Sequence, residues 1–430
     1  MKEKASIKFC RIWSARMLET GNYPIFTMVF QALASIVVCL ECIFAFAPDI
    51  YCDTIGAAFT FPVVRIICGC PVIAYVHYPM ISMDMLQLVQ EKRPTYNNMN
   101  AVASNHTISY LKLLYYRFFA FTYGIVGSFA NEVMVNSTWT RNHIENLWTN
   151  RSSCSRILSK VGIINGSRIE TIYPPCNVAT LCKLEIGKRF RAILSVGQFR
   201  PEKNHSLQLR VFKTLYERDP EKYKNVVLLI VGSCRNYEDI LLVERLRKEI
   251  ANLSIPKKNV VFKINVSFAE LRSFYAHCAI GLHTMWNEHF GISLVEMMAA
   301  GLAVVAHKSG GPRDDIIDVS SEVHRTGYLA TSPDEYANAI EGLLDTLELR
   351  ELSEIDNYNL HDVDDSKLFQ DKVICDGNNR LSVEPLALQS PTSDFEPRLK
   401  IRERARVSTE KFSDEVFASK IVSIFSKFYL

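Results

Sequence analysis

Two glutamates eight positions apart mark a part of the sequence suited to binding a charged ligand. Glu288 precedes a turn at Gly291, and Glu296 follows it within a helical pattern. A helix that begins directly after a turn presents unpaired N–H groups, which together with the helix dipole attract an anion such as a diphosphate. The pattern predicts a phosphate site at Phe290, Gly291 and Ile292, with Glu296 placed to accept both hydroxyls of a ribose. The alternative is a capping carboxylate at Glu288 and a surface carboxylate at Glu296.

A second candidate site follows the apolar run Ala192–Gly197. Arg200 and Lys203 stand three residues apart between this run and a helical pattern over Asn204–Arg218. Arginine binds phosphate oxygens in pairs and lysine neutralises them as a point charge. No Asp-x-Asp metal pair stands beside these cations, so they would stabilise a diphosphate in place of a metal ion. The alternative is a solvated loop in which they pair with Glu202.

Two weaker signals complete the candidate chemistry. His77 lies at the end of the apolar run Pro71–Tyr78, where a single histidine is more often structural. Gly310 and Gly311 form a flexible loop in Lys308–Pro312, which suits a close approach between backbone and ligand.

Parallel strands are the elements that would bring these residues together. Short apolar runs alternate with helical patterns, and the runs of the second half are Ala192–Gly197, Val226–Val231, Val260–Lys263, Ala279–His283 and Ala303–Ala306. The runs of the first half are Pro71–Tyr78, Glu132–Asn136 and Ile169–Tyr173. This alternation predicts an α/β fold with parallel sheets covered by helices. Such sheets bind ligands at the carboxyl ends of their strands, which is where every candidate residue lies.

Length and composition restrict the class of protein. A chain of 430 residues is too long for one ordinary core, so two domains are expected. A formal net charge of +3 excludes a broad basic face and argues against a nucleic-acid partner. The 12 cysteines lack zinc-site spacing and are predicted to be reduced thiols, as in the cytosol.

The predicted domain organisation has four parts. Two prolines in Tyr173–Asn177 mark a stiff connector between the halves. The parts are an N-terminal domain at 1–175, a ligand-binding domain at 176–350, an acidic disordered insertion at 351–400 and a C-terminal helix at 401–430.

Two apolar stretches raise the question of a membrane. Tyr23–Pro48 and Leu111–Val135 each contain interrupting polar residues, so we expect buried or membrane-surface helices, with true membrane spans as the alternative. Asn204 belongs to one of seven Asn-x-Ser/Thr sequons, and a glycan there would block the candidate site. This favours the cytosolic side of a membrane.

Together these motifs resemble the retaining GT-B glycosyltransferases, whose glutamate pair matches Glu288 and Glu296. Four segments resemble more closely the α-1,2-mannosyltransferases of asparagine-linked glycosylation, and these are Val76–Pro79, Gly197–Asn204, Gly281–Gly291 and Ser309–Pro312. The resemblance covers most of the chain. It implies a GT-B fold of two Rossmann-like domains facing a cleft, with the N-terminal domain incomplete.

The resemblance also implies a reaction and its residues. The family transfers mannose from GDP-mannose, with retention, as the fourth and fifth mannoses of a dolichol-diphosphate-linked oligosaccharide. It implies no cofactor or metal, a place on the cytosolic face of the endoplasmic reticulum membrane, and contact with the membrane surface and other mannosyltransferases. The implied catalytic residues are His77, Arg200, Lys203 and Glu288. The implied donor-binding residues are Gly197, Gln198, Lys263, Phe290, Gly291, Ile292, Glu296, Gly310 and Gly311.

Two departures from the family keep other hypotheses open. At the start of this chain we find no counterpart of the family's membrane anchor and glycine-rich first strand-turn. In turn, the insertion at 351–400 of this chain has no counterpart that we find in the family. One alternative is therefore a truncated, inactive paralogue or isoform that acts as a binding or scaffold protein. Another is a GT-B transferase that uses a different sugar nucleotide, such as a UDP-sugar, read by the loop Phe262–Ile264.

Overall fold

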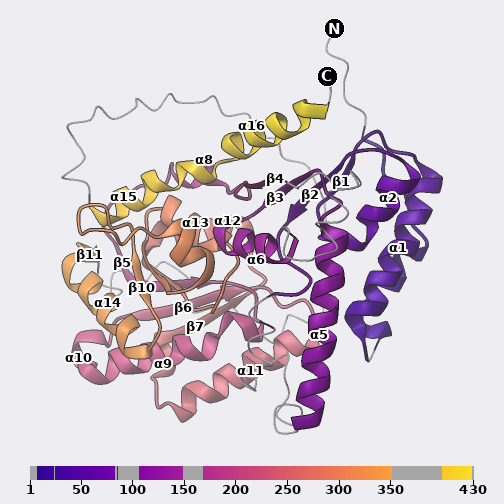
Figure 1. Ribbon diagram of the computed structural model, residues 1–430. Coiled ribbons are helices and arrows are strands. Elements are labelled where there is room, and N and C mark those ends of the chain that lie inside the picture. Colours follow the sequence, from indigo (N-terminus) through magenta and orange to yellow (C-terminus); the bar gives the residue numbers. More distant parts are fainter. Residues whose placement is uncertain are drawn as a thin grey trace.

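The computed structural model describes residues 7–23, 25–82, 85, 106–148, 168–350 and 400–428 of the chain. These residues contain two parallel β-sheets, one from each half of the sequence (Figure 1). The predicted insertion at 351–400 lies outside the described residues, apart from Lys400. The predicted connector Tyr173–Asn177 lies between the last strand of the first sheet and the first strand of the second.

Four short strands form the first sheet, all parallel and in the order β1-β2-β3-β4. They are β1 (Tyr51–Asp53), β2 (Val72–Val76), β3 (Glu132–Val135) and β4 (Arg168–Thr171). The sequence predicted β2, β3 and β4 but not β1, because three residues are too few to show a pattern. Alternate residues of β2 face opposite sides, so Val72, Ala74 and Val76 join one core and Ile73 and Tyr75 another.

Helices from the first half cover one side of this sheet. They are α1 (Thr27–Ala45), α2 (Phe61–Ile67), α5 (His106–Gly127) and α6 (Thr138–Trp148). Phe61, Phe119 and Trp148 pack there with Val72 and Val76 and are almost wholly buried. The apolar stretch Leu111–Val135 therefore divides into α5 and β3. In the described part of the chain, α1 alone has the length and apolar composition of a membrane-crossing helix.

The second sheet has seven parallel strands, in the order β10-β9-β8-β5-β6-β7 with β11 paired to β5. They are β5 (Arg189–Val196), β6 (Val227–Gly232), β7 (Val260–Ile264), β8 (Cys278–His283), β9 (Ala303–His307), β10 (Tyr328–Ala330) and β11 (Leu349–Arg350). The five predicted runs match β5 to β9. The two shortest strands, β10 and β11, were not predicted.

Helices cover both faces of the second sheet, as the alternating pattern predicted. One core lies under α9 (His205–Arg218), α11 (Tyr237–Asn252) and α14 (Pro333–Thr346). The opposite core lies under α8 (Val178–Leu181), α12 (Phe268–His277), α13 (Ile292–Ala299) and α15 (Ile401–Ser408). Central strands are buried on both sides, so β6 and β8 read as continuous apolar runs.

The C-terminal segment joins the two sheets. The predicted single helix at 401–430 is two helices, α15 on the second sheet and α16 (Asp414–Phe425) on the first (Figure 1). Phe417, Ile421 and Ile424 of α16 pack on the side of the first sheet that carries Tyr75. This helix replaces water on a sheet face that would otherwise expose apolar side chains.

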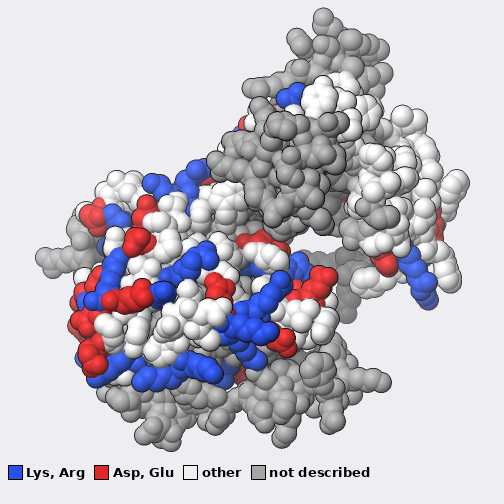
Figure 2. Space-filling view, turned by 90° about the horizontal axis from the view of Figure 1, so that it is seen from below, with Lys and Arg blue, Asp and Glu red and all other residues white. Residues whose placement is uncertain are grey.

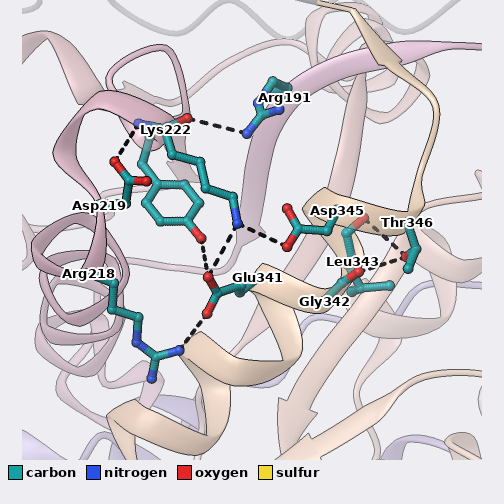
Figure 3. Close-up of polar contacts among 10 residues, drawn as sticks. Arg191, Arg218, Asp219, Lys222, Glu341, Gly342, Leu343, Asp345 and Thr346 are labelled. Carbon is teal, nitrogen blue, oxygen red and sulfur yellow. Dashed lines mark hydrogen bonds and ion pairs between the residues drawn. The ribbon is translucent and has the colours of Figure 1, made fainter.

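A cluster of charges fastens α14 to α9 and to the short helix α10 (Pro220–Tyr223) (Figure 3). The Glu341 carboxylate accepts hydrogen bonds from the Tyr223 hydroxyl at 2.6 Å, from Arg218 at 2.8 Å and from Lys222 at 3.3 Å. Lys222 also lies 2.9 Å from Asp345. The hydrogen bond from Tyr223 and those from the two cations lower the pKa of Glu341 to about 2.

Replacing Glu341 by glutamine tests this cluster. The folded-state pKa of Glu341 is below its ordinary value of 4.5, so its stabilisation is present above about pH 4.5 and is lost as the pH falls toward 2. At pH 7, Glu341→Gln should lower the free energy of unfolding by about 1 kcal/mol. Urea denaturation at pH 7 and pH 3.5 should show a smaller deficit at the lower pH. Glu348→Gln is the control, because the Glu348 side chain is 71% exposed. Equal losses of unfolding free energy in Glu341→Gln at both pH values would contradict the lowered pKa of Glu341.

Candidate active site in the cleft between the two sheets

The carboxyl ends of strands from both sheets border a cleft of about 640 Å³. This volume lies within the range of small-molecule sites. Nine predicted residues line the cleft, namely His77, Gly197, Gln198, Lys203, Glu288, Phe290, Gly291, Ile292 and Glu296. The structure therefore brings both glutamates, one predicted cation and the predicted histidine to one cavity.

An ion pair lies at the centre of this lining. The Lys203 ammonium is 2.5 Å from Oε2 of Glu288, and Nε2 of His283 lies 3.2 Å from the same oxygen. Burial alone would raise the pKa of Glu288, but the hydrogen bond from His283 and the charge of Lys203 hold this pKa well below its usual range. Glu288 is therefore an ionised carboxylate rather than a proton donor.

Lys203 is positioned by a buried polar network behind its loop. The side chain of His205 contacts the Gln198 carbonyl at 3.0 Å and Oε1 of Gln208 at 3.3 Å. Gln208 donates to Thr284 at 2.9 Å, and Thr284 lies within hydrogen-bond distance of the Lys203 carbonyl, also at 2.9 Å. The loop is thus tied to the end of β8, beside the segment that carries Glu288.

The predicted anion site is the start of α13. Gly291 is the N-cap of this helix with φ 117°, a left-handed conformation that side chains rarely adopt. Ile292 and Ser293, the first residues of α13, line the cleft, and the N–H groups at the start of a helix have no partner within the helix. One turn further on, Glu296 accepts a hydrogen bond from the Tyr275 hydroxyl at 2.9 Å. Burial raises the pKa of Glu296, and the bond from Tyr275 opposes that rise.

The two predicted loop glycines support the site from behind rather than lining the cleft. The N–H of Gly311 donates to the Glu288 carbonyl at 2.8 Å. A Cβ on Gly310 would lie 2.3 Å from that carbonyl oxygen, and one on Gly311 would lie 2.4 Å from the carbonyl of Phe290. Glycine is required because two backbone segments touch here.

Besides the two glycines, Arg200 and Lys263 also lie outside the lining of the cleft. Arg200 contacts Glu202 at 3.9 Å, which is the loop pair that the sequence left open as an alternative. Lys263 is buried on β7, and the neighbouring lining residues are Asn265 and Val266. The roles of Arg200 and Lys263 in donor binding stay predictions.

The first half contributes His77 and an aromatic contact with the second half. The His77 side chain is exposed to the cleft, and partial burial lowers its pKa, which favours the neutral ring at pH 7. The Tyr78 ring stacks on the His289 ring with centroids 4.3 Å apart. The Trp139 ring also stacks on the His289 ring, with centroids 4.9 Å apart. These rings place residues next to His77 and Glu288 in direct contact.

A buried aspartate adds a second contact between the halves. Asp315 accepts hydrogen bonds from the Thr138 N–H at 2.9 Å, the Thr138 hydroxyl at 2.5 Å and the Tyr173 hydroxyl at 3.0 Å. Burial raises the pKa of Asp315, while the bonds from Thr138 and Tyr173 oppose the rise. The start of α6 is thereby fixed against the second half.

Sequence reasoning missed several residues of the site. His283 ends a predicted strand, but its apolar neighbours gave no sign that its ring reaches Glu288. Gly232 and Ser233 follow a predicted strand, which could have marked them as lining residues. Tyr78 and His289 come from different halves, and no local pattern could join them.

Comparison with protein families identifies both halves. The family described as ALG11 mannosyltransferase N-terminus matches residues 2–148, and the family described as glycosyl transferases group 1 matches residues 182–355.

Curated relatives resemble nearly the whole chain. A Xenopus laevis protein named GDP-Man:Man(3)GlcNAc(2)-PP-Dol alpha-1,2-mannosyltransferase is 43% identical over 97% of this chain and 73% of its own length. Human and mouse proteins of the same name are 38% and 43% identical, over 98% and 79% of this chain. The chain spans 74% of the human protein and 66% of the mouse protein.

Solved structures share the fold. Anabaena HepE, in complex with UDP and glucose, aligns with a TM-score of 0.55 and 16% identity over 94% of this chain and 84% of its own. A Rickettsia africae glycosyltransferase aligns with a TM-score of 0.56 and 15% identity, over 96% of this chain and 83% of its own. These likenesses confirm the predicted GT-B arrangement of two parallel-sheet α/β domains.

Gly310→Ala tests whether the glycine loop supports Glu288. The new Cβ would clash with the Glu288 carbonyl, and Gly310 has a φ of +57°. We expect the free energy of unfolding in urea to fall by about 2 kcal/mol or more. Gly342→Ala is the matched control, since its Cβ would meet nothing within 4 Å and α14 should gain about 0.5–1 kcal/mol. Similar stabilities of the two variants would contradict the role of Gly310.

Proposed function

The chain belongs to the GDP-Man:Man(3)GlcNAc(2)-PP-Dol alpha-1,2-mannosyltransferase family, and from this premise we propose that it transfers mannose from GDP-mannose to a dolichol-diphosphate-linked oligosaccharide. The observation that carries the proposal is the cleft in which Lys203, Glu288, Glu296 and the start of α13 converge. The set offers a cation, two carboxylates and backbone N–H groups, which match the diphosphate and hydroxyls of a sugar nucleotide.

Each group then has a part in the reaction. Lys203 and the N–H groups at Ile292 and Ser293 stabilise the diphosphate as negative charge develops on it. Glu296 accepts the ribose hydroxyls, and Glu288 accepts a hydroxyl of the mannose. His77 contacts the donor sugar from the opposite wall. Because a cation and a helix start serve the diphosphate, the reaction proceeds without a metal ion.

The chemical step exchanges one bond at the anomeric carbon. The bond from mannose C1 to the diphosphate oxygen breaks, and the 2-hydroxyl oxygen of the acceptor bonds to C1 from the same face. The hydroxyl proton passes to the departing diphosphate, so atoms and charges balance. Attack on that face gives retention, and two such transfers add the fourth and fifth mannoses. Catalysis rests on positioning and on charge stabilisation.

Transfer of radiolabelled mannose from GDP-mannose to a dolichol-linked trimannosyl acceptor tests the activity. Lys203→Ala should reduce kcat/KM about a hundredfold, because a cation that stabilises the departing diphosphate is lost. Lys188→Ala is the control, since that side chain is 62% exposed and lies away from the cleft lining.

Other outcomes of the same assay separate the alternatives. Full activity of Lys203→Ala at subsaturating GDP-mannose would reject the role of Lys203. Transfer from a UDP-sugar but not from GDP-mannose would assign a different donor. Binding of GDP-mannose without transfer would favour a scaffold role. Loss of transfer in excess EDTA would reject the metal-independent step.

The outer face of the first half supports a membrane-bound location. Exposed apolar side chains recur at helical spacing on α1 and α5, namely Phe30, Leu33, Val37 and Phe44, and Tyr110, Leu111, Leu114, Phe118 and Phe121. In Figure 2 the coloured atoms at the right are mostly white with a few charged side chains, whereas charges crowd the part at the left. The face suits contact with lipid, where the dolichol chain of the acceptor resides.

The same reasoning extends to the compartment, for which we propose the cytosolic face of the endoplasmic reticulum. The ten cysteines within the described residues are all free, which fits a reducing environment. The sequon at Asn204 adjoins Lys203, so glycosylation would obstruct the cleft.

Binding to phospholipid vesicles tests the membrane face. Leu114→Glu combined with Phe118→Glu should weaken binding about tenfold or more, because two charges would have to enter the lipid interface. Phe268→Glu is the control, as Phe268 is 50% exposed on α12 in the second half. Equal flotation of all three proteins with vesicles would contradict the proposed face, and carbonate extraction separates surface contact from a membrane span.

A further inference from the structure

His283 is a buried histidine beside the cleft whose position has a functional meaning. It is the last residue of β8, in the middle of the second sheet, and its side chain is only 4% exposed. Its backbone carbonyl accepts a hydrogen bond from the Tyr336 hydroxyl at 3.0 Å. Because the backbone of His283 is held by the neighbouring strands and by Tyr336, and its side chain is buried, the ring has little freedom to move.

The hydrogen bonds to Glu288 are unevenly divided between its two carboxylate oxygens. Nζ of Lys203 and Nε2 of His283 both contact Oε2, at 2.5 Å and 3.2 Å. Oε1 receives no hydrogen bond within the described part of the chain, and Glu288 borders the cleft. One oxygen is thus fixed by the protein and the other is left for a ligand.

In the hydrogen bond between His283 and Glu288, the histidine ring is the donor. An ionised carboxylate can only accept, so Nε2 carries the hydrogen and donates it to Glu288. Nδ1 is buried and has no hydrogen-bond partner among the described residues. The contact with Glu288 is therefore the one polar interaction that the ring makes in the described structure.

Lys203 and His283 differ in what they can do when a diphosphate arrives. Lysine has a flexible four-carbon stem and a compact charge, and Lys203 borders the cleft where phosphate oxygens would bind. A diphosphate competes with Glu288 for this ammonium. His283 is buried and is not among the residues that line the cleft, so a diphosphate bound there has no direct access to its ring.

We propose that His283 is a positioning residue that holds Oε2 of Glu288 so that Oε1 remains directed at a hydroxyl of the donor sugar after Lys203 turns to the diphosphate. This inference rests on the proposed function, in which Glu288 contacts the sugar. It assigns to His283 a part in recognition of the sugar and none in recognition of the nucleotide.

The test compares the affinity of the full chain for GDP with its affinity for GDP-mannose. His283→Phe keeps a planar ring and removes the donor, whereas His283→Gln keeps an N–H donor at a similar reach. Calorimetry should show that His283→Phe binds GDP within about twofold of the wild type. Its affinity for GDP-mannose should fall about tenfold or more, as expected for a lost hydrogen bond to a charged group. His283→Gln should restore most of the affinity for GDP-mannose.

A structural role alone would give a different result. Loss of packing would weaken both ligands equally and lower the melting temperature, so an unchanged ratio of the two affinities in His283→Phe overturns the inference. If His283→Phe fails to fold, His283→Asn serves instead, because its shorter amide does not reach Glu288 and should show the same altered ratio. If the wild type binds neither GDP nor GDP-mannose, the proposed function itself is overturned. If the wild type binds both, but the variants keep its ratio of the two affinities, only the role of His283 is overturned.

Discussion

The placement of one ionised carboxylate governs much of this structure. Glu288 is mostly shielded from water, and a buried charge without partners would be strongly destabilising. The Lys203 ammonium and the His283 ring satisfy it from two different strand ends, β5 with its loop and β8. The polar network through His205 and Gln208 and the glycine loop at Gly310 keep these elements in register. The second sheet therefore positions the partners that stabilise the buried charge of Glu288.

The parts of the fold that depend on local periodicity could be predicted from the sequence. Strands β5 to β9 are continuous apolar runs between helical patterns, and the start of α13 was recognisable from Gly291. Strands β1, β10 and β11 have only two or three residues, so no periodicity could reveal them.

The site was only partly predictable, for a different reason. Lys203 and Glu288 lie in loops that follow strands, and Glu296 lies one turn into α13, so the topology of the sheet brings them to one edge. Whether Arg200 faces the cleft or Glu202 depends on the rotation of a loop residue, and spacing contains no information on that. The ring of His283 reaches Glu288 through tertiary packing, so it looked like any other residue of a buried strand.

The stack of Tyr78, His289 and Trp139 has a mechanical consequence for the enzyme. His77 and Tyr78 are chain neighbours, as are Glu288 and His289, so each ligand-facing residue is about 3.8 Å of backbone away from the stack. A motion that separates His77 from Glu288 would also have to break the stacking of Tyr78 and Trp139 on His289. Opening of the cleft is therefore coupled to the loss of this stacking and of the hydrogen bonds between Thr138 and Asp315.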